Sequence, residues 1–136
     1  QVRDNVDACK CMALMFQKEL AERIVARPNT KAYGRLAVIS QWLCDAHIMY
    51  DLPPHAFTPP PKVSSAVVFL KPKPLDDNAP SFDTVEKVTA AAFNQRRKMV
   101  RSSLKEYLPA IENLGIEPTL RAENLTVQQY LDIALS

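Results

Sequence analysis

Glycine is scarce in this 136-residue chain, which has two. Gly34 and Gly115 stand far apart, and neither has a second glycine near it. A Rossmann fingerprint or a P-loop needs several closely spaced glycines, because the backbone must approach a phosphate there. The chain as printed therefore contains neither kind of glycine-rich nucleotide loop.

Long apolar runs and common catalytic signatures are also missing. No stretch approaches the run of about 18 apolar residues that a membrane-spanning helix requires, and nothing resembles a signal peptide. The motifs G-x-S-x-G and H-E-x-x-H do not occur, and two histidines leave no plausible triad. We therefore expect no membrane partner and no catalytic residue in this chain.

Three cysteines argue against a disulfide framework, because the count is odd and no secretory signal accompanies it. This usage indicates a reducing compartment, and we expect the cytoplasm. Cys9-x-Cys11 with Cys44-x-x-His47 could supply four zinc ligands, but C-x-C is not the common spacing of structural sites. Strand alternation would instead place Cys9 and Cys11 on one buried face. We favour that interpretation and expect no metal.

The first half of the chain alternates between strand and helix patterns. Strand patterns cover residues 9–16, 47–52 and 62–71, and helical spacing covers 17–26 and 33–46. The first strand is apolar on both faces, which predicts burial on both sides. Its connection to the second leaves room for a helical crossover, so those two can be parallel, whereas only ten residues, five of them proline, separate Leu52 from Val63. So short a connection favours antiparallel neighbours for the last two strands.

This pattern predicts an α/β fold containing a β-α-α-β-β piece of a mixed sheet. Three strands are fewer than the usual four to six or so, and the first begins almost at the printed N-terminus. We therefore expect that a further, upstream part of the sheet lies outside this chain.

The second half of the chain is helical in pattern. Residues 71–81 carry the prolines, aspartates and asparagine typical of a linker. Helices are expected at 82–93, about 95–107, 110–114 and from Asn124 or Thr126 onward, with Asp83-x-x-Glu86 as a capping box and Gly115 as a C′ residue. A continuous helix through Asn94 would place Arg96 in an apolar arc, so Arg96 is either buried with a partner or the helix breaks there. We favour the break.

A cluster of five cations is the first candidate site, since a net charge of +2 is too small by itself to imply a polyanionic partner. Its members are Arg96, Arg97, Lys98, Arg101 and Lys105, with no acid among residues 95–105. On a helix the last four would share about a third of a turn. A solvated face is one interpretation, but such faces usually mix signs. A single-sign stripe suits the phosphate backbone of a nucleic acid.

The proline-rich segment 53–65 is the second candidate. Pro59, Pro60 and Pro61 fix the backbone, so the loop should be stiff, and Phe57 stands at its entrance near the end of a strand. A rigidly held aromatic ring is a good stacking surface for a base taken out of its helix. The alternative is a phenylalanine that fills the core beside a hairpin connection.

A third group contains Lys18, Glu19 and Arg35, near predicted strand and helix ends. These side chains could bind a ligand, but ordinary surface ion pairs explain them equally well.

Several segments together resemble a known family. They are MALMFQKELAERIVA, KAYGRLAVISQW, PPHAFTPPPKVSSAVV, AFNQRRKMVRSSL and RAENLTVQQYLDIA, in this order. The chain is similar along nearly its whole length to the small-subunit ribosomal RNA adenine N6-dimethyltransferases, which are related to the erythromycin-resistance methylases. FTPPPKV followed by FNQRRK is a specific combination.

The resemblance implies a fold and an activity. Residues 1–73 would be the last part of a Rossmann-like methyltransferase domain, 74–80 a linker and 81–136 a small helical RNA-binding domain. The family uses S-adenosylmethionine to dimethylate two adjacent adenosines near the 3′ end of small-subunit RNA. Phe57, Pro59 and Pro60 would line the target-base pocket, with Phe57 stacking on the flipped adenine. Arg96, Arg97 and Lys98 of FNQRRK would bind the RNA, and the charge pattern adds Arg101 and Lys105 to the same surface.

The chain departs from the family in one large respect. The glycine-rich cofactor loop, the acidic ribose ligand and the Asn-x-Pro-Tyr catalytic tetrapeptide of the family lie upstream, and none occurs here. We therefore expect that these 136 residues alone neither bind S-adenosylmethionine nor transfer methyl groups. Two other interpretations stay open, a non-catalytic RNA-binding or ribosome-binding module and a large-subunit methylase of the resistance type. Nothing in the sequence demands a dimer, so we expect a monomer.

Overall fold

The computed structural model describes residues 11–52, 64–75 and 78–136. The chain forms two compact units, each built from two segments. Gln1–Val25 and Ser40–Leu75 make the first, here called the sheet unit. Ala26–Ile39 and Asp76–Ser136 make the second, here called the helical unit. One boundary therefore falls inside helix α2 (Arg35–Leu43), and another inside the stretch 74–80 where the sequence predicts a linker.

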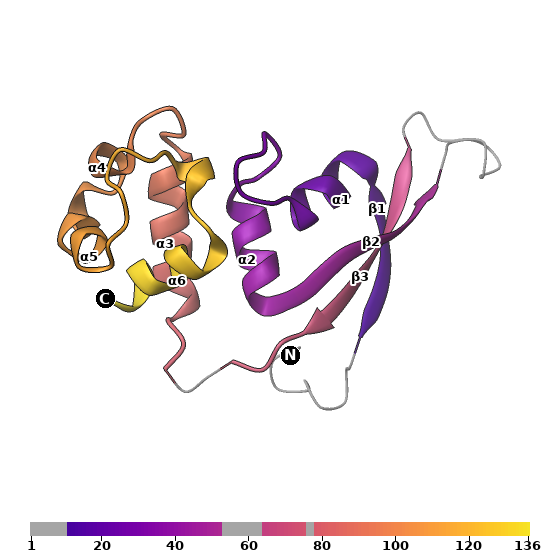
Figure 1. Cartoon of the computed structure of the whole chain (residues 1–136). Helices are drawn as coiled ribbons and strands as arrows, with labels where there is room; N and C mark the ends of the chain where they lie inside the picture. The colour runs from indigo at the N-terminus through magenta and orange to yellow at the C-terminus, as the bar shows by residue number, and fades with distance from the viewer. Residues whose placement is uncertain (1–10, 53–63, 76–77) are drawn as a thin grey trace. The chain divides into compact units, whose positions relative to one another are not determined.

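The sheet unit contains three strands in the order β1-β3-β2 (Figure 1). They are β1 (Met12–Gln17), β2 (Cys44–Leu52) and β3 (Ser65–Pro72). β3 is antiparallel to both neighbours, so the antiparallel pairing of the last two strands is confirmed. β1 and β2 run in the same direction, as the crossover length allows, but β3 lies between them. The described sheet is therefore antiparallel rather than mixed, because connection length sets the direction of a strand but not its neighbour.

Helix α1 (Lys18–Val25) covers one face of this sheet (Figure 1). Ala21 and Ile24 of α1 form a buried core with Ala66 and Val68 of β3. Partly buried apolar side chains surround that core, namely Phe16, Val25, Ala46, Ile48 and Leu70. The unit is thus a two-layer arrangement in which the middle strand supplies the most deeply buried sheet residues.

Strand β1 is much more exposed than its sequence predicts. Leu14 and Met15 are 43% and 57% exposed, and Cys11 just before the strand is exposed as well. The expectation of burial on both faces is wrong for the described residues, because β1 is an edge strand with one described neighbour and one covering helix. Cys9, the other half of the expected pair, lies outside the described residues.

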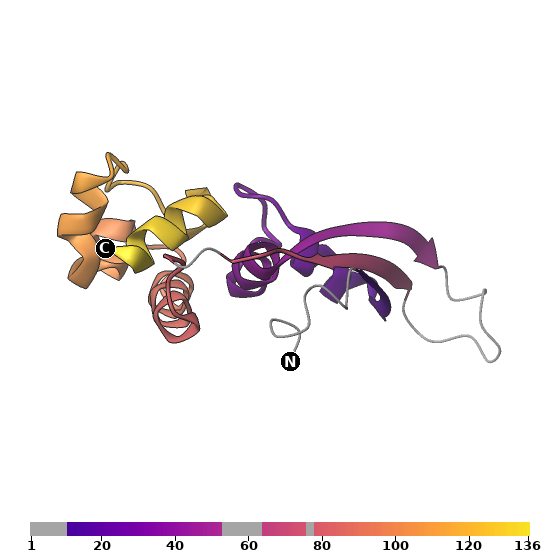
Figure 2. The same ribbon diagram turned by 90° about the horizontal axis from the view of Figure 1, so that it is seen from below.

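The helical unit places α3 and α6 side by side, as Figures 1 and 2 both show. Its helices are α3 (Phe82–Phe93), α4 (Val100–Ser103), α5 (Leu108–Asn113) and α6 (Val127–Leu135), with 3-10 turns at Lys105–Tyr107 and Ala122–Asn124. Val85, Val88 and Ala92 form the buried face of α3. Tyr130 and Ile133 form that of α6, so the core lies between these two helices.

The ends of α3 and α6 show which capping predictions hold. Ser81 caps α3, with its Oγ accepting from the N–H of Thr84 at 3.2 Å, so the predicted Asp83 box is wrong. Serine is a strong N-cap, and it stands two residues earlier than expected. Helix α6 begins after Thr126, one of the two predicted starts, where Thr126 and Gln129 cap each other reciprocally.

The segment Ala26–Ile39 belongs to the helical unit. The family resemblance instead places it, as part of residues 1–73, in the methyltransferase domain. Tyr33 is fully buried, and its ring lies 5.9 Å from that of Phe93, edge to face. Phe93 in turn lies 5.6 Å from Tyr130 of α6. Three aromatic rings from three segments therefore join this stretch to the helical core.

Among residues 11–52, 64–75 and 78–136, no helix is both long enough and apolar enough to cross a bilayer.

Candidate nucleic-acid interface

The residues that follow α3 form a turn rather than a second long helix. The break predicted at Asn94 is confirmed, since Asn94 is the C-cap and donates to the carbonyl of Ala90 at 2.9 Å. The next helix begins at Val100, not near residue 95 as predicted. An open hollow of about 350 Å³ lies at this turn, lined by Phe93, Asn94, Gln95, Arg96, Arg97 and Lys98.

Two features hold the chain in place directly after the turn. The N–H of Val100 donates to the carbonyl of Leu120 at 2.6 Å, and that of Arg101 to Pro118 at 3.1 Å. Val100 and Leu104 are 0% and 1% exposed, so they anchor α4 to the core. With these two side chains turned inward, Arg101 is left on the outer surface.

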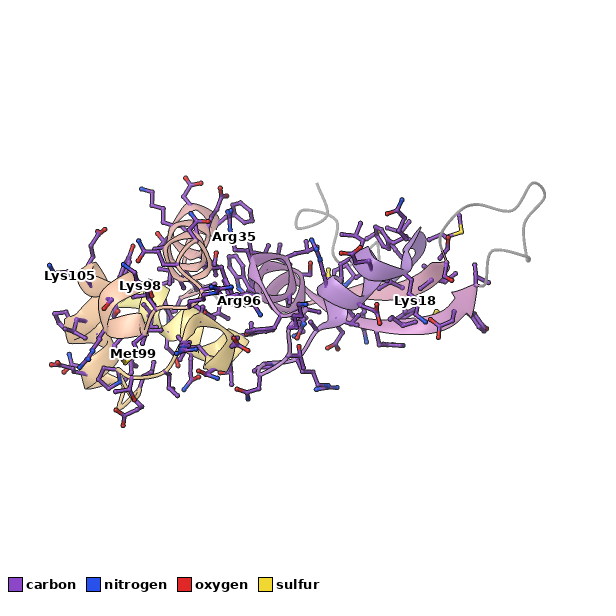
Figure 3. The ribbon with its side chains drawn as sticks, turned by 90° about the horizontal axis from the view of Figure 1, so that it is seen from above. Lys18, Arg35, Arg96, Lys98, Met99 and Lys105 are labelled. Atoms are coloured by element: carbon purple, nitrogen blue, oxygen red, sulfur yellow. The ribbon has the colours of Figure 1, made fainter. Side chains whose placement is uncertain are left out.

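Four of the predicted cations are exposed and have no acidic partner within the described part of the chain. They are Arg97, Lys98, Arg101 and Lys105, here called the basic surface. Figure 3 labels Lys98 and Lys105 on the orange ribbon of the helical unit. The single continuous helical stripe expected from the sequence is wrong, because residues 94–98 form a turn and 105–107 a 3-10 turn. None of the four forms an ion pair with a described acidic residue, and exposed cations without such a partner attract polyanions.

Arg96 differs from its neighbours because its guanidinium is engaged within the chain. Nη1 donates to the carbonyl of Tyr33 at 2.7 Å, and Nη2 to those of Thr30 and Lys31 at 3.2 and 3.0 Å. Nε lies 3.9 Å from Oε1 of Glu123. The sequence offered burial with a partner or a helix break. The structure contains the break, and Arg96 has partners but is only partly buried, with its side chain 33% exposed.

One further cation lies beside the basic surface and was missed by the sequence analysis. Arg121 forms an antiparallel bridge with Met99, and its side chain is exposed. Opposite residues in such a bridge have their Cβ atoms about 5 Å apart. Twenty-odd residues separate the two in sequence, so no spacing rule could have connected them.

The third group of candidates forms exposed ion pairs. Lys18 lies 4.0 Å from Asp51, and Arg35 lies 3.7 Å from Glu86. Glu19 accepts from Arg23 at 2.9 Å, one helical turn away. Pairs of this kind contribute little to stability, and their geometry matches the surface interpretation of these residues.

The second candidate site lies outside the described residues, since Phe57, Pro59 and Pro60 fall within 53–63. Of the residues that are described, no three His, Cys, Asp or Glu side chains gather as a metal site would require. The two glycines do not fit a cofactor loop either. Gly34 precedes α2 and Gly115 follows α5, and neither lies against a second glycine.

An α/β unit joined to a helical unit with an unpaired basic surface defines a candidate nucleic-acid-binding protein. The family described as ribosomal RNA adenine dimethylase matches residues 2–136, and the chain belongs to that family. It is 54% identical over 129 residues to the ribosomal RNA small subunit methyltransferase A of Ruegeria sp. (strain TM1040), covering 92% of this chain and 46% of that one. It is 57% identical over 125 residues to the same-named protein of Caulobacter vibrioides, covering 90% and 48%.

A solved structure has the same fold. The dimethyladenosine transferase from Plasmodium falciparum superimposes with a TM-score of 0.80 at 26% identity, over 91% of this chain and 55% of that one. The chain thus spans about half the length of the curated relatives it matches.

Proposed function

We propose that the chain is the C-terminal part of an S-adenosylmethionine-dependent dimethyltransferase of small-subunit ribosomal RNA. The full protein would dimethylate two adjacent adenosines near the 3′ end of that RNA. Membership in the family and more than 50% identity to proteins named for the small ribosomal subunit support this proposal. Within it, residues 1–73 would complete the catalytic domain, 74–80 would be a linker and 81–136 would bind RNA. The segment Ala26–Ile39, although part of 1–73 in sequence, would belong with the RNA-binding part, because it packs in the helical unit.

The basic surface carries the RNA-binding part of the proposal. Arg97, Lys98, Arg101 and Lys105 are exposed and meet no carboxylate among the described residues. Each such cation can displace a counterion from an RNA phosphate, and arginine can also contact phosphate in two places at once. Arg121, beside Met99, would extend the same surface.

The target-base pocket is proposed from the family resemblance of FTPPPKV. Phe57 would stack on the adenine after it leaves its helix, and Pro59 and Pro60 would hold the loop rigid. In a protein that joins this sequence to the upstream half of its relatives, Phe57→Ala should reduce turnover more than RNA binding. An unchanged rate would remove Phe57 from the mechanism.

The residues present here do not fit the methyl donor. The printed sequence contains neither a glycine-rich loop nor the family's Asn-x-Pro-Tyr tetrapeptide. We accordingly propose that the 136 residues alone neither bind S-adenosylmethionine nor transfer its methyl group. Incorporation of isotope from the labelled donor into RNA, with a sample of verified intact mass near 15.3 kDa, would contradict this.

A binding experiment tests the function of the chain as it stands. We expect the 136-residue chain to bind a fragment from the 3′ end of small-subunit RNA more tightly than a large-subunit fragment of equal length and charge. Equal binding to both would favour a general RNA-binding module, and preference for the large-subunit fragment would favour the resistance-type methylases. Failure to bind either RNA would contradict the proposal.

A further inference from the structure

Arg96 stands next to the basic surface in sequence, but its hydrogen bonds point into the protein. A guanidinium carries five N–H donors. Three of these donors form hydrogen bonds with the main-chain oxygens of Tyr33, Thr30 and Lys31. Nε lies 3.9 Å from Oε1 of Glu123, so most of the guanidinium is turned toward groups of the chain itself, and two of its five N–H donors make no hydrogen bond within the described residues.

The packing around Arg96 agrees with this inward role. Its guanidinium carbon lies 5.8 Å from the centre of the Phe93 ring, and its side chain is 33% exposed. Glu123 provides charge compensation, and it is 34% exposed. A cation already compensated by a carboxylate contributes little attraction to a polyanion.

The loop 29–33, whose carbonyls accept from Arg96, is also hydrogen-bonded to residues 123 and 124. Asn29 has a φ of 70°, in the left-handed region that asparagine tolerates. Its N–H donates to the carbonyl of Glu123 at 2.7 Å, and its Oδ1 accepts from Asn124 at 2.8 Å. The carbonyls of residues 30–33 are thereby brought to the turn that follows α3.

We propose that Arg96 is a positioning residue: it fixes the turn 94–98 against the loop 29–33, so that Arg97 and Lys98 face the RNA, and it does not contact RNA itself. This rests on the proposed function of the basic surface. Arg97 and Lys98 follow Arg96 directly and line the same hollow. The direction of their side chains therefore depends on where the Arg96 backbone is held.

Arginine-to-lysine exchange separates positioning from direct contact. Lysine keeps the charge but cannot supply a planar fork to three carbonyls. With all variants shown to be folded at the assay temperature by circular dichroism, Arg96→Lys should weaken binding of the small-subunit RNA fragment roughly tenfold, the size of one lost charge-assisted contact. Arg97→Lys, the matched control, should stay within about threefold because a lysine still neutralises the phosphate.

Each other outcome of that comparison overturns the proposal. Equal, small effects of Arg96→Lys and Arg97→Lys would make Arg96 an ordinary phosphate contact. A lower melting temperature for Arg96→Lys with unchanged RNA affinity would make it a structural residue without influence on the surface. If Arg97→Gln bound the RNA fragment as tightly as the wild type, that result would instead contradict the function of the basic surface itself.

A second measurement needs no variant and so cannot fail through misfolding. Phenylglyoxal modifies accessible arginines, and mass spectrometry locates the modified residues. Arg97 and Arg101 should react readily in the free chain and be protected by the RNA fragment, whereas Arg96 should react slowly with and without RNA. Fast modification of Arg96 that RNA suppresses would show direct contact and contradict the proposal.

Discussion

Nη1 of Arg96 donates a hydrogen bond of 2.7 Å to the main-chain carbonyl of Tyr33, which lies 63 residues earlier. Two further carbonyls of the same loop accept from Nη2. These contacts explain why the helical unit contains the segment Ala26–Ile39 although the strands β2 and β3 intervene in sequence. The unit is held together by a charged side chain as well as by its apolar core.

Arg96→Ala should therefore destabilise the chain. Three carbonyls would lose a charged donor, and we expect the free energy of unfolding to fall by about 1–3 kcal/mol. Arg97→Ala removes an exposed cation without a partner among the described residues, so it should change that value by less than about 0.5 kcal/mol. Urea denaturation of both variants makes the comparison, and equal effects would contradict the role given to Arg96.

Gly115 ends α5 with a φ of 72°, as its predicted C′ role requires. A Cβ there would meet nothing within 4 Å, so substitution creates backbone strain without a clash. Gly115→Ala should cost about 1 kcal/mol of unfolding free energy. Gly115→Asn should cost less, because asparagine tolerates this conformation. Thermal denaturation ranks the two, and an alanine variant as stable as the wild type would contradict the expected strain.

Tyr33 and Tyr130 should make stability depend on alkaline pH. Burial raises the pKa of both phenols above the ordinary value; at Tyr130 the charge of Tyr33 raises the pKa further and that of Arg96 lowers it. The unfolded chain ionises these groups near pH 10 or so, while the folded chain keeps its protons. The stabilising contribution is therefore complete below about pH 10 and decreases as pH rises beyond it.

A Tyr33→Phe variant tests this dependence. The buried hydroxyl of Tyr33 has no hydrogen-bond partner among the described residues, so the variant should be at least as stable at pH 7. Its unfolding free energy should also fall less steeply above about pH 10. The matched Tyr130→Phe should lose about 1 kcal/mol at pH 7, because Tyr130 donates to the carbonyl of Ala122. Identical pH profiles for Tyr33→Phe and the wild type would show that burial does not raise the pKa of Tyr33.

Local signals in the sequence predicted several elements closely. The end of α3, the break at Asn94 and the end of α5 at Gly115 all follow from apolar periodicity and from residues that favour helix ends, whereas the cap of α3 was misassigned. The antiparallel pairing of β2 with β3 follows from a connection too short for a crossover. Each of these depends on residues close together in the chain.

Long-range relationships could not be predicted in the same way. The partners of Arg96 are main-chain carbonyls, which every residue possesses, so no residue type marks them. The position of β3 between its neighbours depends on sheet order rather than on connection length. Arg121 joins the basic surface only through its bridge to Met99. The composition of the cluster predicted a basic surface, but the positions of its side chains could be known only from the fold.

We propose that the basic surface binds ribosomal RNA through its phosphates. The most direct test is the slope of the logarithm of the binding constant against the logarithm of salt concentration, for the small-subunit RNA fragment. Replacing Arg97, Lys98 and Arg101 together by glutamine should reduce the magnitude of the slope by about two to three units, because each lost phosphate contact accounts for roughly 0.7–0.9. Lys87→Gln, an exposed charge on α3, is the control and should leave it unchanged. A triple variant that binds with the wild-type slope would contradict the account.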